Sequence, residues 1–364
     1  MMLFLTIILS IYFTTISLLV YGFTKVKTYT SLNLVPQTAF TIIIPFRNES
    51  ENLPLLLESI SKLNYPMDLI EVILVDDDSE KVFSVQYSVF NIQIVKNKRN
   101  SNSPKKDAIT TAIPLVKTPW IITTDADCVV TQNWLLTLDN YIQAHEVFMI
   151  AGAVSYNGND SFLHHFQQLD LASLQGATIG SFGIERGFMC NGANLAYTKS
   201  LFQELNGFEG NDTIVSGDDV FLWQKAITKF PDKVHYLKSN NTIVNTKPLD
   251  DWKSLFYQRV RWASKTTSYQ SNFGKILGLI VFGGNISLWF IVCCLLFEIG
   301  DFYSLLFLII TKSLIDFILI YKTNQFLKIK TQSFLLSSLL YPFFSTTVAL
   351  YAVLGKYEWK GRWF

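Results

Sequence analysis

The sequence predicts an α/β domain with a mostly parallel sheet, joined to helices that span or lie in a membrane. Apolar runs rich in β-branched residues alternate with helical stretches between about residues 40 and 125. This order builds right-handed crossovers and a parallel sheet that is covered on both faces. Longer runs without any charged side chain, 1–24, 276–297 and 331–355, are each about long enough to cross a bilayer.

The alternating part begins after a polar linker. Residues 40–45 read Phe-Thr-Ile-Ile-Ile-Pro, which predicts a buried strand that is stopped by the proline. Ser50 or Asn52 is a suitable N-cap for the first helix, and Pro54 fits its first turn. The elements expected in order are strands at 40–45, 70–75 and 92–95, a helix from Ser50 or Asn52 to about residue 63, and a helix from 105 to about 116.

The next strand leads into the stretch Thr118 to Cys128, TPWIITTDADC. It is apolar at first and ends in Asp125-Ala126-Asp127. In open α/β sheets, ligands bind just outside the carboxyl ends of the strands, and in an extended segment both aspartates point to one side. Two such oxygen ligands suit Mg²⁺ or Mn²⁺ that also holds substrate phosphates. The alternative is a solvated acidic turn.

A second strand, 70–75, also ends in carboxylates, Asp76 and Asp77, and Lys105 and Lys106 lie between the two acidic ends in sequence. Two acidic ends at one sheet edge repel each other unless a cation or hydrogen-bond donors lie there. A nucleotide-sugar site supplies both, because a metal sits on the diphosphate and the base offers N–H groups. The alternative for the lysine pair is a solvated helix start.

The second half of this block contains three further candidate segments. The small residues of 190–194, Cys-Asn-Gly-Ala-Asn, allow close approach of the backbone to a ligand, or form a packed turn. Asp218 and Asp219 precede a helical stretch that Ser216 or an aspartate could cap, although two adjacent carboxylates exceed what a cap requires.

The third segment is Gln258-Arg259-Val260-Arg261-Trp262. On a helix, Gln258, Arg261 and Trp262 share one face. Arg261 can bind phosphate oxygens with two parallel hydrogen bonds, and the indole of Trp262 offers a flat surface to sugar or lipid. The alternative is an amphipathic helix at the membrane interface.

Taken in order, these segments resemble family-2 glycosyltransferases, which have the GT-A fold. The resemblance covers about residues 40–265 and rests on TIIIPFRNE, EVILVDDDS, PKKDAIT, TTDADC, FMCNGANLAYTKSLF, SGDDVFLWQKA and QRVRWASK. The chain is most similar in character to membrane-embedded members with a Q-x-x-R-W motif, which include processive polysaccharide synthases and ceramide-glucosyltransferase-like enzymes. The resemblance implies an inverting transferase that uses a nucleotide-activated sugar and a divalent metal, Mg²⁺ or Mn²⁺.

The resemblance also implies roles for single residues. It places Pro45, Arg47 and Glu49 beside the nucleotide, and Asp76 or Asp77 on the base, which is expected to be uracil. It places Lys105 or Lys106 near the diphosphate; many relatives have Gly-Lys where this chain has Pro104-Lys105, so either lysine can be the one that reaches phosphate. It makes Asp127 a metal ligand, with Asp125 toward the ribose or the ion, and Asp219 the general base, with Asp218 before it. It assigns the acceptor and diphosphate side to Asn191, Gly192, Ala193, Asn194, Gln258, Arg261 and Trp262.

The apolar runs predict how the chain meets the membrane. Residues 1–24 are followed by Lys25 and Lys27, which predicts an uncleaved anchor with the following domain in the cytoplasm. A fourth run, 302–321, is interrupted by Lys312 and Asp316, which are either an ion pair or a polar surface for a lipid head group. The connection 322–330 is basic and therefore cytoplasmic. If 331–355 spans, the basic tail after it breaks the charge rule, so one stretch is interfacial or re-entrant, or the rule fails.

The expected division is a transmembrane anchor at 1–24, a linker at 25–39, a GT-A domain at 40–265 and a C-terminal membrane region at 266–364. With 364 residues and a net charge of +1, nothing favours a nucleic-acid partner. The expected function is transfer of a sugar from a nucleotide-sugar donor, with UDP favoured, to a lipid acceptor at the inner or plasma membrane. The alternatives are a processive polysaccharide synthase making a glycan, a catalytically silent assembly subunit, and a transporter.

Overall fold

The computed structural model describes residues 1–32, 34–81, 90–211, 214, 216–354, 358–359 and 362–363. The chain forms two compact units. The sheet unit contains Lys27–Asn157 and Met189–Lys247, and the helical unit contains Met1–Val26, Gly158–Phe188 and Pro248–Phe364. The helical unit thus takes a segment from inside the expected 40–265 domain, because a helix in 158–188 packs among the apolar helices.

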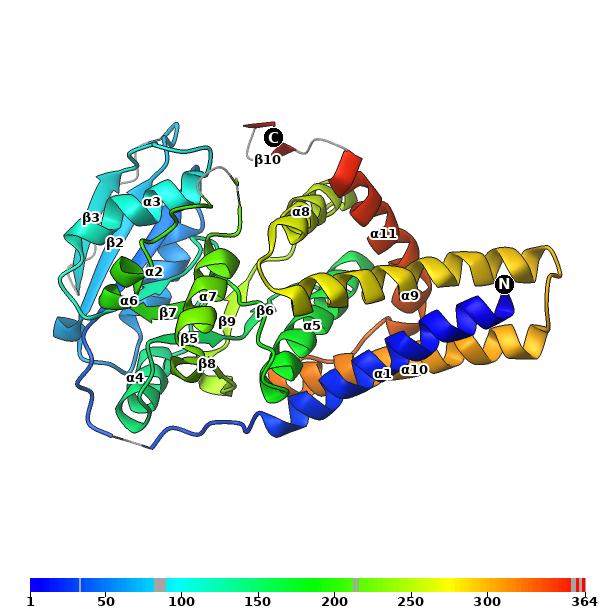
Figure 1. Cartoon of the computed structure of the whole chain (residues 1–364). Helices are drawn as coiled ribbons and strands as arrows, with labels where there is room; N and C mark the ends of the chain where they lie inside the picture. Colours follow the sequence, from blue (N-terminus) through cyan, green and yellow to red (C-terminus); the bar gives the residue numbers. More distant parts are fainter. Residues whose placement is uncertain are drawn as a thin grey trace. The chain divides into compact units, whose positions relative to one another are not determined.

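The sheet unit is built on a mostly parallel, seven-stranded sheet, as predicted (Figure 1). Strands β1 to β4 and the pair β5–β8 are parallel to their neighbours, whereas β7 runs antiparallel between β4 and β5. In spatial order the strands are β3 (Asn91–Lys96), β2 (Ile70–Asp76), β1 (Phe40–Phe46), β4 (Trp120–Thr123), β7 (Leu195–Thr198), β5 (Met149–Gly152) and β8 (Val234–Leu237). A separate parallel pair joins β6 (Val154–Tyr156) to β9 (Val244–Thr246).

Helices flank this sheet and bury both of its faces. Ile42, Ile43 and Ile44 of β1 are all fully buried although they alternate in direction, as expected for a strand covered on both sides. The helices of this unit are α2 (Leu53–Ser61), α3 (Pro104–Ala112), α4 (Trp134–Ala144), α6 (Lys199–Glu204) and α7 (Asp218–Lys229), with 3₁₀ turns at Met67–Leu69, Ile113–Leu115, Pro231–Lys233 and Asn240–Thr242.

Strand β1 does not stop at Pro45, as the sequence suggested, but continues to Phe46. Its pairing with β4 ends at Ile43, so beyond that point β1 has a ladder partner on one side only. Proline lacks an N–H group and is tolerated where a strand edge is open. The extra residue matters because it carries the chain directly to Arg47 and Glu49.

The helical unit consists of long helices that are mostly apolar. Four of them, Met2–Lys25, Asn272–Leu296, Phe302–Leu327 and Phe334–Val353, are long and apolar enough to cross a membrane, which confirms the four predicted hydrophobic helices. Its elements are α1 (Met2–Lys25), α5 (Phe162–Gly183), α8 (Trp252–Ser264), α9 (Asn272–Leu296), α10 (Phe302–Leu327) and α11 (Phe334–Leu354), with a 3₁₀ turn at Thr266–Ser268 and short strands β10 (Glu358–Trp359) and β11 (Arg362–Trp363).

The two charged residues inside α10 form an ion pair. Lys312 Nζ lies 2.8 Å from Asp316 Oδ2, and the hydroxyl of Tyr12 on α1 donates to Asp316 Oδ1 at 2.6 Å. Lys312 also lies over the Tyr12 ring, 4.7 Å from its centroid. Because each charge has its partner, the pair connects α1 to α10, which supports the structural alternative over a lipid head-group site.

Candidate active site

The two aspartates after β4 lie in a turn. Strand β4 ends at Thr123, and the Cys128 N–H donates to the Asp125 carbonyl at 3.1 Å. The expectation of an extended segment with both side chains on one side is therefore wrong: the chain folds back as soon as it leaves the sheet edge. The turn still brings Asp125 and Asp127 together at the carboxyl end of a central strand, where a ligand site was predicted.

Asp127 is held in an environment that opposes its charge. Burial, followed by the nearby charges of Asp125 and Glu49, raises the pKa of Asp127 to about 6, although hydrogen bonds from the Thr246 side chain and the backbone partly offset this. Repulsion among three carboxylates is what a bound cation relieves.

The donor set therefore fits Mg²⁺ or Mn²⁺, which take carboxylate oxygens and complete their coordination with substrate phosphates and water. Within the part of the chain that the structure describes, no group of three or more His, Cys, Asp or Glu side chains could hold a metal alone. An ion here would need the substrate as a ligand.

Lys105, at the start of α3, connects the metal-side aspartates to the predicted catalytic pair. Its Nζ lies 2.6 Å from Asp125 Oδ1 and 3.5 Å from Asp218 Oδ2. Burial alone would lower the pKa of Lys105, but Asp125, Asp218 and Asp219 together raise it above its usual value. The ammonium group therefore stays charged at any physiological pH.

Gly192 brings the small-residue segment against the start of α7. Its N–H donates to Asp219 Oδ2 at 2.9 Å, and its carbonyl accepts from the Thr123 hydroxyl at 3.0 Å. A Cβ atom at this position would lie 3.1 Å from Asp219 Cβ and 3.3 Å from both Asp218 Oδ2 and Lys105 Nζ. A hydrogen on the Cα atom is what lets the end of β4, Lys105 and the two α7 aspartates meet.

Two backbone N–H groups hold the Asp219 carboxylate. Its Oδ1 accepts from the Val220 N–H at 2.8 Å and its Oδ2 from the Gly192 N–H at 2.9 Å. The N-cap of α7 is Gly217, with φ +86°, and not Ser216. Asp218 and Asp219 thus occupy the first turn of α7, where the helix dipole favours negative charge.

The neighbours of Gly192 support the loop. Asn194 is 3% exposed, and its amide donates to the carbonyls of Ala153 and Thr242 while accepting from the Trp134 indole. The Asn191 side chain accepts from the Ala193 N–H at 3.0 Å. Of the four predicted residues in this segment, Gly192 is the one that contacts the acidic pair in these bonds.

Lys106 points elsewhere, although it follows Lys105 directly. It is 2% exposed, donates to the carbonyls of Asn211 and Ile214, and lies over the Phe221 ring. These bonds hold the segment that leads into α7. The structure thus separates the two lysines that the sequence could not: Lys105 faces the carboxylates, and Lys106 supports the backbone.

The predicted base-binding residues lie at the ends of β1 and β2. Arg47 donates to the Asp77 carbonyl at 3.3 Å, and the Asp77 carboxylate accepts from Asn97 at 2.7 Å and Arg99 at 3.4 Å. Asp76 accepts from the Ser79 N–H at 3.0 Å. Pro45 pairs with Val75 in the register of these strands.

Arg99, which also binds Asp107 at 3.2 Å, was not predicted. The sequence feature that could have indicated Arg99 is its positive charge in the polar loop after β3.

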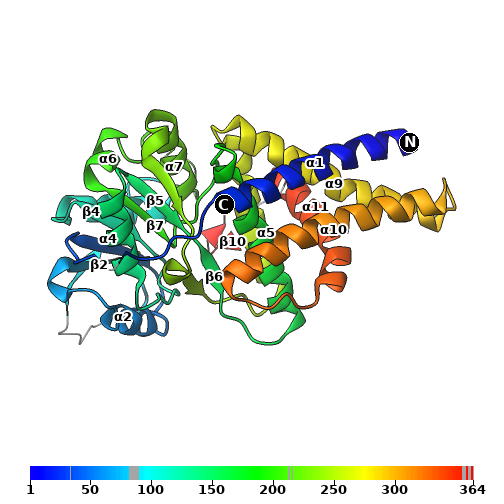
Figure 2. The ribbon, with the colours of Figure 1, turned by 90° about the horizontal axis from the view of Figure 1, so that it is seen from below.

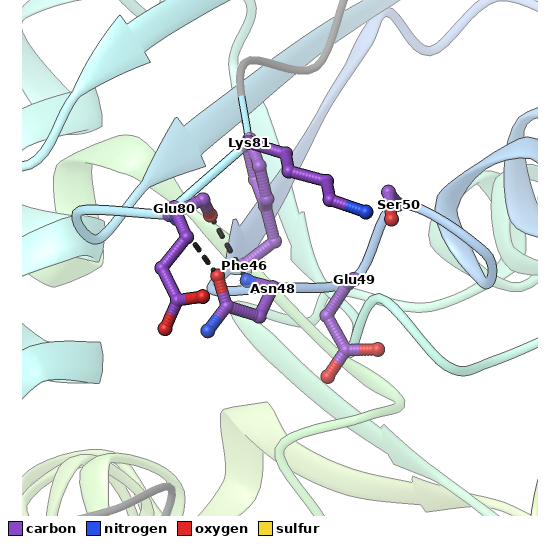
Figure 3. A pocket seen from close by; sticks show the side chains of 7 residues that line it. Phe46, Asn48, Glu49, Ser50, Glu80 and Lys81 are labelled. Atoms are coloured by element: carbon purple, nitrogen blue, oxygen red, sulfur yellow. Dashed lines mark hydrogen bonds between the residues drawn. The ribbon is translucent and has the colours of Figure 1, made fainter.

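A hollow of about 220 Å³ lies between the loops after β1 and β2 (Figure 3). The loops are tied together, because the Asn48 N–H donates to Ser79 and the Asn48 side chain accepts from the Glu80 N–H. The lining residues are Phe46, Asn48, Glu49, Ser50, Ser79, Glu80 and Lys81.

Gln258, Arg261 and Trp262 belong to α8 of the helical unit, and their part in the site stays a prediction. The residue of this motif that the sequence did not single out is Arg259. Arg259 is 5% exposed and forms an ion pair with Asp170 of α5. Its guanidinium carbon lies over the Trp262 ring, 4.2 Å from the ring centroid, and its guanidinium group donates to the Gln258 side chain. The sequence feature that could have indicated Arg259 is its charge within the amphipathic helix α8.

Comparison with known proteins bears on the fold. The sequence model of glycosyl transferase family 2 matches residues 41–205. The mannosyltransferase PcManGT from Pyrobaculum calidifontis, solved with GDP-Man and Mn²⁺, has 15% identity and a TM-score of 0.61, with 94% of this chain and 98% of that chain covered. Residues 1–349 of S. aureus TarS, solved with UDP-GlcNAc, have 13% identity and a TM-score of 0.43, covering 89% of this chain and 95% of theirs. No curated protein sequence matches the chain.

The fold and the matched family define a glycosyltransferase with a GT-A fold. The match to the glycosyl transferase family 2 model begins at β1, includes the two aspartates after β4 and ends just after α6.

Proposed function

We propose that the protein is an inverting transferase that moves a sugar from a nucleotide-sugar, with UDP the expected nucleotide, to a membrane lipid. One observation carries the proposal. Lys105, Asp125, Asp218 and Asp219 come from three separate segments and meet around Gly192. A structural sheet edge has no need of this arrangement of charge.

The transfer needs a base on the side of the sugar away from the departing diphosphate. The acceptor hydroxyl must lose its proton as its oxygen attacks the anomeric carbon, and Asp219 is assigned to take it. The Gly192 and Val220 N–H groups orient the Asp219 carboxylate. Inversion follows because a single displacement forms no covalent intermediate with the protein.

The opposite side of the sugar requires positive charge. Lys105 supplies a fixed ammonium group beside Asp125. Asp127 and Asp125 would hold the divalent ion, which when bound offsets the negative charge that grows on the departing diphosphate. The hollow beside Glu49 and the Asp77 carboxylate, held by Asn97 and Arg99, lie on the side assigned to the nucleoside.

The apolar helices are the basis for the proposed acceptor and for the proposed orientation of the protein in the membrane. Among the described residues, three such helices follow the sheet unit in sequence, which is few for a channel that would pass a growing polysaccharide, so a lipid is favoured over a glycan chain. Lys25 ends α1 and Lys27 follows it, which favours a cytoplasmic sheet unit at the inner or plasma membrane.

The test is release of UDP by the purified, detergent-solubilised full chain from a panel of UDP-sugars with Mn²⁺ and a lipid extract. We expect saturable, Mn²⁺-dependent release that Asp219→Asn abolishes while nucleotide binding persists. Transfer that survives both Asp219→Asn and Asp127→Asn would refute the assigned chemistry.

A silent assembly subunit is separated by titrating UDP with and without Mn²⁺, since it need not bind the nucleotide. Mass spectrometry of lipids from cells with the parent or the Asp219→Asn chain would then identify the product.

A further inference from the structure

Three of the four apolar helices run side by side, and their ends carry opposite charge (Figures 1 and 2). Leu5 and Leu9 of α1 pack with Leu288 and Ile291 of α9 and with α10. The Met1 sulfur lies 3.7 Å from Cys294 Sγ. The start of α1 therefore lies with the acidic connection 298–301. The other end of the bundle is basic, with Lys25 as the last residue of α1 and three lysines in 322–330.

Helices α5 and α8 lie at the basic end. On α5, a Cβ atom at Gly183 would overlap the carbonyl of Gly22, near the end of α1. Just after α5, the Phe188 ring packs on Phe273 at the start of α9, with centroids 5.7 Å apart. Helix α8 is bonded to α5 through Arg259 and Asp170, and its last residue precedes α9 by a short turn.

Helix α11 begins in the basic half of the bundle and ends at the basic end. At its start, the Phe334 ring packs on Phe317, in the second half of α10, with centroids 5.0 Å apart, and Phe334 also lies against Leu169 and Ala172 of α5. In its second half Val348 packs on Val260 of α8, and the Tyr351 ring lies 5.4 Å from the Phe256 ring. Figure 1 shows α11 crossing α9, whereas α1 and α10 run along it.

The middle of α11 contacts both α9 and α5. On α9, Trp289 Nε1 donates to the Pro342 carbonyl at 3.4 Å, and the Trp289 ring lies 4.6 Å from the Phe343 ring. The Tyr341 hydroxyl donates to Asp170 Oδ1 at 3.0 Å, and the other oxygen of Asp170 binds Arg259 Nε at 2.5 Å. The Asp170 and Arg259 side chains are 5% and 6% exposed.

We infer that α11 is a re-entrant helix, which enters and leaves the leaflet on the basic side, so that the chain crosses the membrane three times. Lipid covers the exposed face of α11, which carries the apolar side chains of Leu335, Leu339 and Val353. The end of α11 at Leu354 then lies on the same side as Lys25 and the 322–330 connection. This satisfies the charge rule that a fourth crossing would break.

The test is thiol labelling of the full chain in sealed membranes with a membrane-impermeant maleimide, applied to intact cells and to inside-out vesicles. Single cysteines are placed at Lys330→Cys, at Ile299→Cys and after Phe364 as an added residue, with Lys356→Cys as a second tail site. The parent chain, in which Cys293 is the exposed one of four cysteines, gives the background. The readout requires no glycosyl transfer, so it is independent of the proposed function.

We expect both tail cysteines and the 330 cysteine to react in inside-out vesicles and to be protected in intact cells, with the 299 cysteine showing the reverse. Tail cysteines that react with the 299 pattern would overturn the inference, because α11 would then span. A 299 cysteine that follows the 330 pattern would also overturn it, because α9 and α10 would then not be crossings.

Discussion

Replacing Lys105 by methionine is the sharpest test of how the charges in the sheet unit work together. The substitution keeps the length of the side chain and removes the ammonium group that lies 2.6 Å from Asp125 and 3.5 Å from Asp218. We expect kcat to fall about 100- to 1,000-fold, the usual effect of losing one preorganised group that stabilises developing charge.

The effect on folding should be much smaller than the effect on catalysis. At 3.5 Å and an effective dielectric constant of about 20, the attraction to Asp218 is about 5 kcal/mol before screening. The Lys105 side chain is 22% exposed and that of Asp125 is 44% exposed, so water screens the pair, and the net loss should be nearer 1–3 kcal/mol. Removing the Lys105 ammonium group leaves the carboxylates of Asp125, Asp218 and Asp219 near one another, so the repulsion among them is not relieved.

The assay is steady-state UDP release with saturating Mn²⁺, alongside thermal unfolding of each variant. Lys105→Arg, which keeps the charge, is the conservative control, and Lys106→Met is the matched one. Because Lys106 is buried and binds backbone carbonyls, its loss should mainly lower the unfolding temperature. If Lys105→Met kept full kcat while Lys106→Met lost it without loss of stability, the assignment of the two lysines would be reversed.

Three further predictions follow from other contacts. Gly192→Ala should lower kcat with little change in stability, since the added methyl group would lie 3.1 Å from Asp219 Cβ. An unchanged kcat in UDP release would show that the methyl group fits without displacing Asp219. With UDP present at saturation, Mn²⁺ affinity should fall about tenfold per pH unit below pH 6 and level off above it, because the proton that the raised pKa of Asp127 retains there must leave as the ion binds; calorimetry with UDP that showed constant Mn²⁺ affinity from pH 5 to 7 would contradict this. Asp170→Asn should destabilise the protein by about 3–5 kcal/mol, as expected for a broken buried ion pair, and Asp170→Leu with Arg259→Met should recover much of that loss in thermal unfolding.

The sign of the Asp127 effect on stability can also be checked without metal. Its pKa is raised in the folded protein, so the folded state holds a proton between about pH 4 and 6 that the unfolded chain has lost. The stability that this proton contributes is therefore present at low pH and is lost as the pH rises through about 6. Asp127→Asn should flatten that part of the stability profile measured by urea unfolding.

Local sequence determined much of this protein. Continuous apolar runs predicted β1, β2 and β4, because a strand buried on both faces has few other readings, whereas β3 was predicted from a shorter run and is mostly exposed. Long apolar runs predicted the long helices. The residue types at the strand ends also pointed to a ligand site, since carboxylates at the edge of a parallel sheet need a counter-charge.

Only the tertiary structure decided which of these residues meet. Gly192 lies 27 residues before Asp219, and their contact depends on β7 running antiparallel beside β4, which no local pattern specifies. The choice between Lys105 and Lys106 depends on how α3 is rotated, since neighbouring side chains on a helix point in different directions. The same holds for α11: its composition suits a membrane-crossing helix, but its direction is set by the contacts of Tyr341, Val348 and Tyr351 with α5 and α8, and hydropathy measures composition without direction.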